Sequence, residues 1–210
     1  MPPHAPIAAP PDPLPRPPAD LAGRTLPVRT VSVGETLPRF HDARHGPVFF
    51  NRTRDYRWNA PQGSYGVCYA GLSLEASFAE TFLRTPGATL ISMDLVETRA
   101  LSRLVATREI RLVEMADTGL ARLGATSAVC SILPYDLPQE WSAALYAHPE
   151  RPDGILYRSS HDDGQFCAAL FEPAGNALED DGRRETNLLA CGWFWDLMDR
   201  YLIGLPPGAL

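Results

Sequence analysis

Short apolar runs alternate with amphipathic stretches along most of the chain. Residues 66–70 (GVCYA) have the length and apolar character of a buried strand. A helix is predicted to follow, with Ser73 as its N-cap and Leu83 near its end, because Pro86 and Gly87 stop it. The chain therefore has a turn–strand–helix unit near its middle.

Further strands are predicted wherever short runs alternate or contain β-branched residues. The last two of them are joined by a polar turn, HDDG. The predicted strands cover residues 89–95, 101–105, 110–113, 154–159 and 165–171.

Two more helices are predicted in the second half of the chain. One runs from residue 137 to about 147, with Asp136 as its cap and a proline in its first turn. The other runs from residue 186 to about 202 and has apolar residues at i, i+4 spacing, as in a packed amphipathic helix. Strands and helices mixed in this order predict an α+β fold.

The N-terminal end differs in composition from the rest. Nine of the 21 prolines lie within residues 1–20, and a segment so poor in amide donors and apolar side chains does not form a packed core. We therefore expect a proline-rich, disordered leader over residues 1–24 and a single domain over residues 25–210, a length that suits one hydrophobic core.

Charge and motif content exclude several functional classes. The net charge of −6 and pI near 5.3 argue against nucleic-acid binding by this chain. No apolar run reaches the roughly 20 residues that a membrane span needs, and the N-terminus lacks the order of a secretory signal. P-loop, G-x-G-x-x-G and G-x-S-x-G motifs are absent.

The four cysteines are far apart, so we expect buried, reduced thiols and a cytoplasmic protein. His161, Asp162 and Asp163 are adjacent in a turn, where their side chains point apart, and no metal site is predicted.

Candidate chemistry lies in the turn–strand–helix unit of residues 51–82. Arg57 is in the turn, Tyr69 is at the end of the strand, and Glu80 is on the helix among apolar neighbours. A guanidinium, a phenol and a carboxylate suit a small, anionic, aromatic ligand such as a nucleotide. The alternatives are an exposed arginine, a core tyrosine and a solvated surface glutamate, and spacing alone does not choose between them.

Two more residues are candidates outside this unit. Arg39 is a second anion clamp, although a salt bridge to one of the acids fits it equally well. Ser159 ends a predicted strand beside a polar turn, and a hydrogen-bonding role suits it better than nucleophilic catalysis.

Four short motifs, in this order, resemble the RES domain proteins, best known as toxins of RES–Xre toxin–antitoxin modules. One departure from the family pattern is Trp58, where phenylalanine is commoner. The motifs are Arg39-Phe40; Arg57-Trp58-Asn59 with Gly63 and Val67-Cys68-Tyr69-Ala70; the helix from Ser73 to Glu80; and Gly154-Ile155, Tyr157 and Ser159.

The resemblance implies an ADP-ribosyltransferase-like fold, with a mixed sheet and flanking helices, and NAD as a substrate that is consumed. Glu80 would stabilise the positive charge that develops on the ribose when the nicotinamide–ribose bond breaks. Arg39 and Arg57 would clamp the pyrophosphate, Tyr69 would pack against the nicotinamide or its ribose, and Ser159 would orient the nicotinamide end. No further cofactor is implied.

The resemblance also implies an Xre-like antitoxin as partner and cleavage of NAD by phosphorolysis or hydrolysis. Two other functions stay open: ADP-ribosyl transfer to a protein target, and a catalytically silent nucleotide-binding module. A homo-oligomer is compatible with the sequence, which leaves the oligomeric state undetermined.

Overall fold

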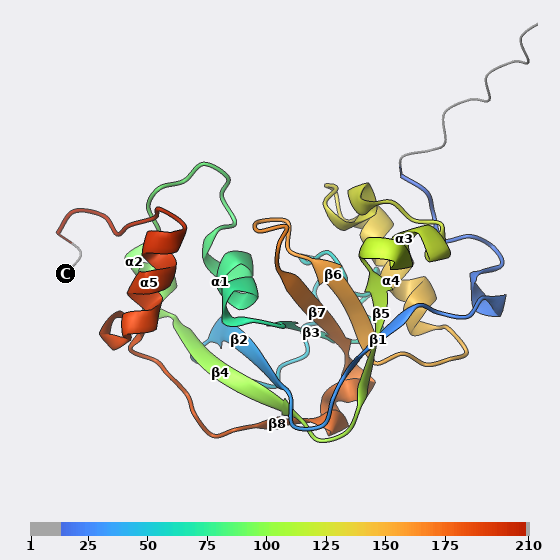
Figure 1. The fold of residues 1–210 in the computed structure, drawn as a ribbon, viewed down its shortest axis with the longest axis horizontal. Helices are drawn as coiled ribbons and strands as arrows, with labels where there is room; N and C mark the ends of the chain where they lie inside the picture. Colours follow the sequence, from blue (N-terminus) through green and yellow to red (C-terminus); the bar gives the residue numbers. More distant parts are fainter. Residues whose placement is uncertain (1–13, 209–210) are drawn as a thin grey trace, which may run out of the picture.

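The computed structural model describes residues 14–208, which form an α+β fold of two sheets and flanking helices (Figure 1). This confirms the predicted fold class. The strands are β1 (Val28–Val31), β2 (Thr36–Asp42), β3 (Val67–Gly71), β4 (Arg99–Ala106), β5 (Ile110–Met115), β6 (Gly154–Arg158), β7 (Phe166–Phe171) and β8 (Leu178–Asp180). The helices are α1 (Leu74–Phe82), α2 (Met93–Glu97), α3 (Asp117–Leu123), α4 (Asp136–Tyr146) and α5 (Gly192–Arg200), and the 3₁₀ turns are η1 (Leu21–Gly23), η2 (Ser127–Cys130), η3 (Glu172–Ala177) and η4 (Leu188–Ala190).

The larger sheet is mixed and has the strand order β1-β5-β6-β7-β3. β5 and β6 are parallel, and the other neighbours are antiparallel. A parallel pair needs a crossover, and α3, η2 and α4 lie on it. The smaller sheet is antiparallel, in the order β2-β4-β8.

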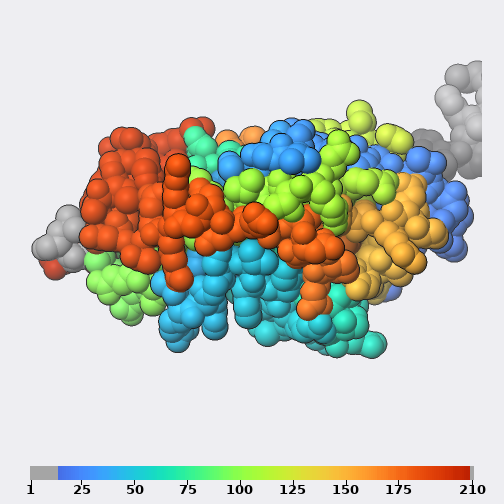
Figure 2. Space-filling model, turned by 90° about the horizontal axis from the view of Figure 1, so that it is seen from below, coloured from blue at the N-terminus to red at the C-terminus, as the bar shows by residue number. Residues whose placement is uncertain are grey.

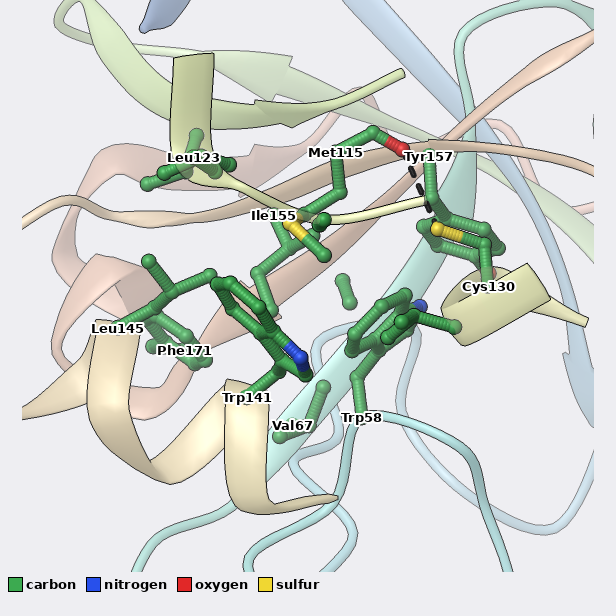
Figure 3. Packing of buried hydrophobic residues seen from close by; sticks show 14 of the residues in the cluster. Trp58, Val67, Met115, Leu123, Cys130, Trp141, Leu145, Ile155, Tyr157 and Phe171 are labelled. Carbon is green, nitrogen blue, oxygen red and sulfur yellow. Dashed lines mark hydrogen bonds between the residues drawn. The ribbon is translucent and has the colours of Figure 1, made fainter. Parts of the chain in front are cut away.

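Apolar side chains form clusters on both faces of the larger sheet. One cluster joins this sheet to α3 and α4, and Trp58, Trp141 and Tyr157 fill its centre (Figure 3). A second cluster lies between the two sheets, and a third joins α1, α2 and α5. In Figure 1, α2 and α5 lie at one end of the molecule and α3 and α4 at the other, with α1 between them.

The β3–α1 junction confirms the predicted strand and helix start. The Ser73 hydroxyl oxygen accepts a hydrogen bond from the Ala76 backbone N–H at 3.0 Å, as an N-cap does. A Cβ on Gly71 would lie 2.5 Å from the Ser73 carbonyl oxygen and 2.6 Å from the Ser77 nitrogen. Glycine therefore lets the helix start directly against the strand end.

Three local predictions were wrong. The strand predicted at residues 89–95 is instead a bridge at Leu90 followed by α2, because the Ser92 hydroxyl accepts from the Leu95 N–H and starts a helix. Asp136 lies in the first turn of α4 rather than at its cap. The last predicted helix is divided into η4 and α5, because Cys191 has an extended backbone between them.

Residues 1–13 of the expected leader lie outside the described residues, but residues 14–24 pack on the domain instead of being disordered. Leu21 is buried in the core. The Pro15 carbonyl accepts a hydrogen bond from the Trp141 indole N–H at 2.8 Å, and Arg16 pairs with Glu140. The segment is thus held by contacts of Pro15 and Arg16 with α4 and by burial of Leu21, whose carbonyl also contacts the His148 ring.

The chain after β7 crosses the molecule. Seen from below, it runs as an orange-to-red band from η3 toward α5, with the cyan residues between β2 and β3 beneath it (Figure 2). These residues form the long loop that carries much of the candidate site.

Candidate functional site

A cavity of about 710 Å³ opens where α1 meets β2 and β3. The loop between β2 and β3 and the turn after β6 complete its wall. Four of the five predicted site residues line it: Arg39, Arg57, Tyr69 and Glu80. Arg57, Tyr69 and Glu80 of the turn–strand–helix unit therefore share one cavity. Arg39 joins them from β2.

The loop that carries Arg57 is fixed by side chains of α4. Gln139 is buried, and its amide N–H groups donate to the backbone carbonyls of Arg54 at 2.9 Å and Tyr56 at 3.1 Å. The Ser142 hydroxyl donates to the Trp58 carbonyl at 2.6 Å. These carbonyls therefore point into the protein.

Arg57 itself lies against the ring of Tyr135, with its guanidinium carbon 5.3 Å from the ring centroid. Its Nε–H is buried and has no acceptor within residues 14–208, and the same holds for the Nε–H of Arg39. Such donors are rare in folded proteins because each costs the free energy of a lost hydrogen bond. Both arginines thus have hydrogen-bonding capacity that the described chain does not use.

The hydroxyl of Tyr69, which lies on β3, binds the Trp58-Asn59 part of the Arg57-Trp58-Asn59 motif. It accepts from the Trp58 backbone N–H and donates to the Asn59 side-chain oxygen, both at 2.9 Å. Burial raises the pKa of Tyr69 well above its ordinary value. The phenol is therefore neutral at physiological pH and cannot serve as a phenolate base.

Arg39 projects from β2 and is held by backbone groups rather than by an acid. One terminal nitrogen donates to the Tyr69 carbonyl and contacts the Cys68 sulfur, and the other lies 3.5 Å from the Phe49 carbonyl. Arg39 is in none of the ion pairs formed by residues 14–208. The salt bridge that the sequence allowed for Arg39 is therefore not formed within these residues, and no carboxylate among them neutralises its positive charge.

Glu80 lies on α1 and reaches the turn after β6. Its Oε1 accepts from the Ser160 backbone N–H at 3.3 Å. No arginine forms an ion pair with it among the described residues. A backbone N–H thus orients the carboxylate without neutralising it.

Ser159 does not line the cavity and is buried behind it. Its hydroxyl oxygen accepts from the backbone N–H groups of His161 at 3.1 Å and Asp162 at 3.3 Å, so it shapes the turn. The next residue, Ser160, lines the cavity instead. The structure brings Ser159 near the site but gives it no direct exposure to the cavity.

Several lining residues were not among the site residues predicted from the sequence. Arg84 and Arg99 add two cations without an ion pair in residues 14–208, and His161 faces the same space. Burial lowers the pKa of His161 below its ordinary value, with Arg57 and Arg84 adding to this and Glu80 opposing it. Arg84 lies two residues after the end of α1, close in sequence to Glu80, and this closeness is the signal by which the sequence could have placed it at the site.

The cavity therefore has an uneven charge distribution. Four arginines line it, and of the two lining carboxylates Asp42 is bound by Arg44 at 2.6 Å, while Glu80 is unpaired among the described residues. Such a surface attracts anions and presents one carboxylate to them.

Two other classes of site were searched for within residues 14–208. No group of three or more histidine, cysteine, aspartate or glutamate side chains is placed to hold a metal ion. None of the helices there has the length and apolar character to cross a membrane.

Known proteins resemble this chain in sequence and in structure. A probable toxin, y4kH, of Sinorhizobium fredii (strain NBRC 101917 / NGR234) is 33% identical over 63 residues, which are 30% of this chain and 49% of that protein. The chain thus spans about half the length of this relative. A chain in the crystal structure of the M. tuberculosis MbcT–MbcA toxin–antitoxin complex superposes with a TM-score of 0.62 at 14% identity, covering 81% of this chain and 92% of that one.

At 14% identity, the structural likeness concerns the fold alone. The match to a family model extends over more of this chain than the match to y4kH. Residues 32–189 match the family model described as the RES domain. This region contains the motifs that suggested the resemblance, together with Arg39, Arg57, Tyr69 and Glu80. Because the match covers well over half of the chain, the protein belongs to the RES domain family.

Proposed function

We propose that this chain is an NAD-consuming toxin that cleaves the nicotinamide–ribose bond of NAD. The observation that carries the proposal is the cavity in which Glu80, unpaired among residues 14–208, faces arginines that likewise have no acidic partner there. NAD offers a pyrophosphate for the arginines and a bond whose cleavage creates positive charge for the carboxylate.

Glu80 supplies electrostatic stabilisation in this mechanism. As the bond to nicotinamide breaks, positive charge builds on the ribose, and a carboxylate that no cation has neutralised stabilises it most. The hydrogen bond from the Ser160 N–H keeps the carboxylate oriented toward the cavity. Such fixed charges need little rearrangement when the reaction occurs.

Arg39 and Arg57 bind the pyrophosphate, since guanidinium groups form paired hydrogen bonds with phosphate oxygens. Their backbone and ring contacts hold them in place before the substrate arrives. The neutral Tyr69 packs against the nicotinamide or its ribose and does not exchange a proton. Ser159 acts indirectly, because it shapes the turn that carries Ser160 and His161.

We further propose that an antitoxin protein, of Xre type, binds this chain and that the pair acts in the cytoplasm, where NAD is abundant. The support is the probable-toxin name of the S. fredii relative and the toxin–antitoxin complex that contains the structural neighbour.

The test is an NAD assay with purified protein, in the presence and absence of phosphate. Wild type should consume NAD, and Glu80→Gln should lower the rate by about 10²- to 10³-fold, the usual effect of removing one electrostatic stabiliser. Glu75→Gln is the matched control, because Glu75 lies on the same helix but pairs with Arg200 outside the cavity. Equal NAD consumption by wild type and Glu80→Gln would contradict the proposal.

The products separate the remaining functions. Free ADP-ribose indicates hydrolysis, and its 1″-phosphate indicates phosphorolysis. Label from NAD that appears on a protein indicates ADP-ribosyl transfer, which the same charge distribution would serve. NAD binding by calorimetry without any product indicates a catalytically silent module.

A further inference from the structure

The rim of the cavity contains an aromatic pair that the cleavage chemistry does not use. His45 and Phe49 are stacked, with ring centroids 4.9 Å apart and an interplanar angle of 11°. Both line the cavity, and Phe49 is 40% exposed. Phe50, the next residue, packs on the cluster between the sheets. The chain thus packs one phenylalanine, half-buried, against the protein and leaves its neighbour facing the cavity.

Arg39 places this pair relative to the catalytic end. Its guanidinium donates to the Tyr69 carbonyl on one side and contacts the Phe49 carbonyl on the other. Tyr69 belongs to the end that holds Glu80 and Arg57. A ligand whose pyrophosphate binds Arg39 would therefore extend toward Glu80 in one direction and toward Phe49 in the other.

Two other aromatic rings of the cavity each have an arginine guanidinium over one face; Tyr56 also contacts the ring of Tyr69, and Tyr135 is only half-buried. The guanidinium of Arg84 lies 5.7 Å from the centroid of Tyr56, and that of Arg57 lies 5.3 Å from the centroid of Tyr135. Phe49 contacts the ring of His45 and no other ring or cation within residues 14–208. Its second face is the aromatic surface best placed to stack on a flat ligand group.

We propose that Phe49, backed by His45, is the base-stacking subsite for the adenine end of the dinucleotide. This rests on the proposed function, since a substrate whose labile bond lies at Glu80 must place its second aromatic group on the far side of the pyrophosphate. Stacking on Phe49 would determine affinity for the adenylate half and leave the chemical step unchanged.

The kinetic test compares two substrates that share the labile bond. NAD contains adenine, whereas nicotinamide mononucleotide does not. Phe49→Leu, which keeps apolar bulk but removes the ring, should raise KM for NAD by about 5- to 150-fold, the range that corresponds to loss of a base–aromatic stack. It should leave kcat/KM for nicotinamide mononucleotide within about twofold, and Phe49→Tyr should restore the wild-type KM for NAD.

A binding test does not depend on turnover. Calorimetry with ADP as probe should show binding to the wild-type chain, weakened to the same extent by Phe49→Leu and restored by Phe49→Tyr. Leu202→Ala is the control, because Leu202 is 83% exposed and outside the cavity.

The outcomes distinguish the subsite from the proposed function. ADP binding that depends on the Phe49 ring, with no NAD turnover, supports the subsite and contradicts the cleavage proposal. NAD turnover with a KM that Phe49→Leu does not change overturns the subsite and leaves the cleavage proposal standing. An equal loss with NAD and with nicotinamide mononucleotide also overturns the subsite, because the ring would then be acting on the reactive end.

Discussion

Tyr69 illustrates how a single hydroxyl can fix the position of a loop. The ring lies in β3, and the hydroxyl satisfies one donor and one acceptor of the 58–59 motif. In the sequence, Arg57 precedes Tyr69 by twelve residues and Glu80 follows it by eleven, spacings that permit the three side chains to share a cleft. The sequence did not reveal that the hydroxyl is bound to the very motif that carries the arginine.

Tyr69→Phe is expected to destabilise the protein and to weaken catalysis together. It leaves the buried Trp58 N–H and the Asn59 oxygen without their partner, at a cost of about 1–3 kcal/mol in the free energy of unfolding. Denaturant unfolding measures this. Tyr146→Phe is the control, since that side chain is 37% exposed. An unchanged unfolding free energy for Tyr69→Phe would show that the two groups find other partners.

At the scale of elements, α4 is a support for the site although it contributes no side chain to the cavity. Its buried Gln139 and Ser142 bind three carbonyls of the loop around Arg57. Sequence predicted the helix from a capping aspartate and a proline in its first turn, but it gave no reason to connect this helix with a loop some 80 residues earlier. Hydrogen bonds across such a distance arise only once the crossover between β5 and β6 brings α4 onto the sheet.

Gln139→Met tests this support, because methionine keeps the volume and removes both N–H donors. We expect a loss of about 1–3 kcal/mol in unfolding free energy for each buried carbonyl left unpaired, and a higher KM for NAD because Arg57 is less firmly held.

Glu140→Gln is the control on the neighbouring position, where only an exposed ion pair with Arg16, worth at most about 1 kcal/mol, is lost. A normal KM in a destabilised Gln139→Met protein would mean that α4 supports the fold alone.

Elements with a strong local signal were predicted well, and those without one were not. The β3–α1 unit has its own cap and close-packed glycine, and β6 and β7 are joined by a short polar turn. The segment at residues 89–95 has strand-like composition, yet Ser92 caps a helix there. Val96 of this helix is also buried in the cluster that joins α1, α2 and α5, a tertiary contact that adds to the cap and that local composition does not reveal.

At the scale of the whole molecule, the free energy of unfolding depends on pH through a buried histidine, His41. His41 is 4% exposed; its Nδ1–H donates to the Asp42 carbonyl, and its Nε2 accepts from the Ser102 hydroxyl, so the ring is neutral. Burial is the largest influence and lowers the pKa of His41; the hydrogen bond to the Asp42 carbonyl and the charge of Asp180 oppose this, and the charges of Arg39 and Arg184 add to it.

Acid should therefore destabilise the fold through His41. Below about pH 6.5 the unfolded chain binds a proton at this histidine and the folded chain does not, so the unfolding free energy falls by at most about 1.4 kcal/mol per pH unit until the folded-state pKa is reached. Denaturant unfolding at pH 7.5 and 5.5 measures the difference. His41→Gln should show a smaller fall than wild type, and the contribution of His161 should remain in both. Equal falls would assign the effect to other groups.

The sequence by itself determined the fold class and the central strand–helix unit, because these follow from periodicity and caps, and it indicated Arg57, Tyr69 and Glu80 as candidates whose spacing permits them to share a cleft. Only the tertiary structure decided that Arg84, Arg99 and His161 share the cavity and that Ser159 lies behind it. It also decided that residues 14–24 pack on α4. The reason is physical: these placements depend on contacts between segments distant in the chain, and local residue preferences carry no information about which distant groups will meet.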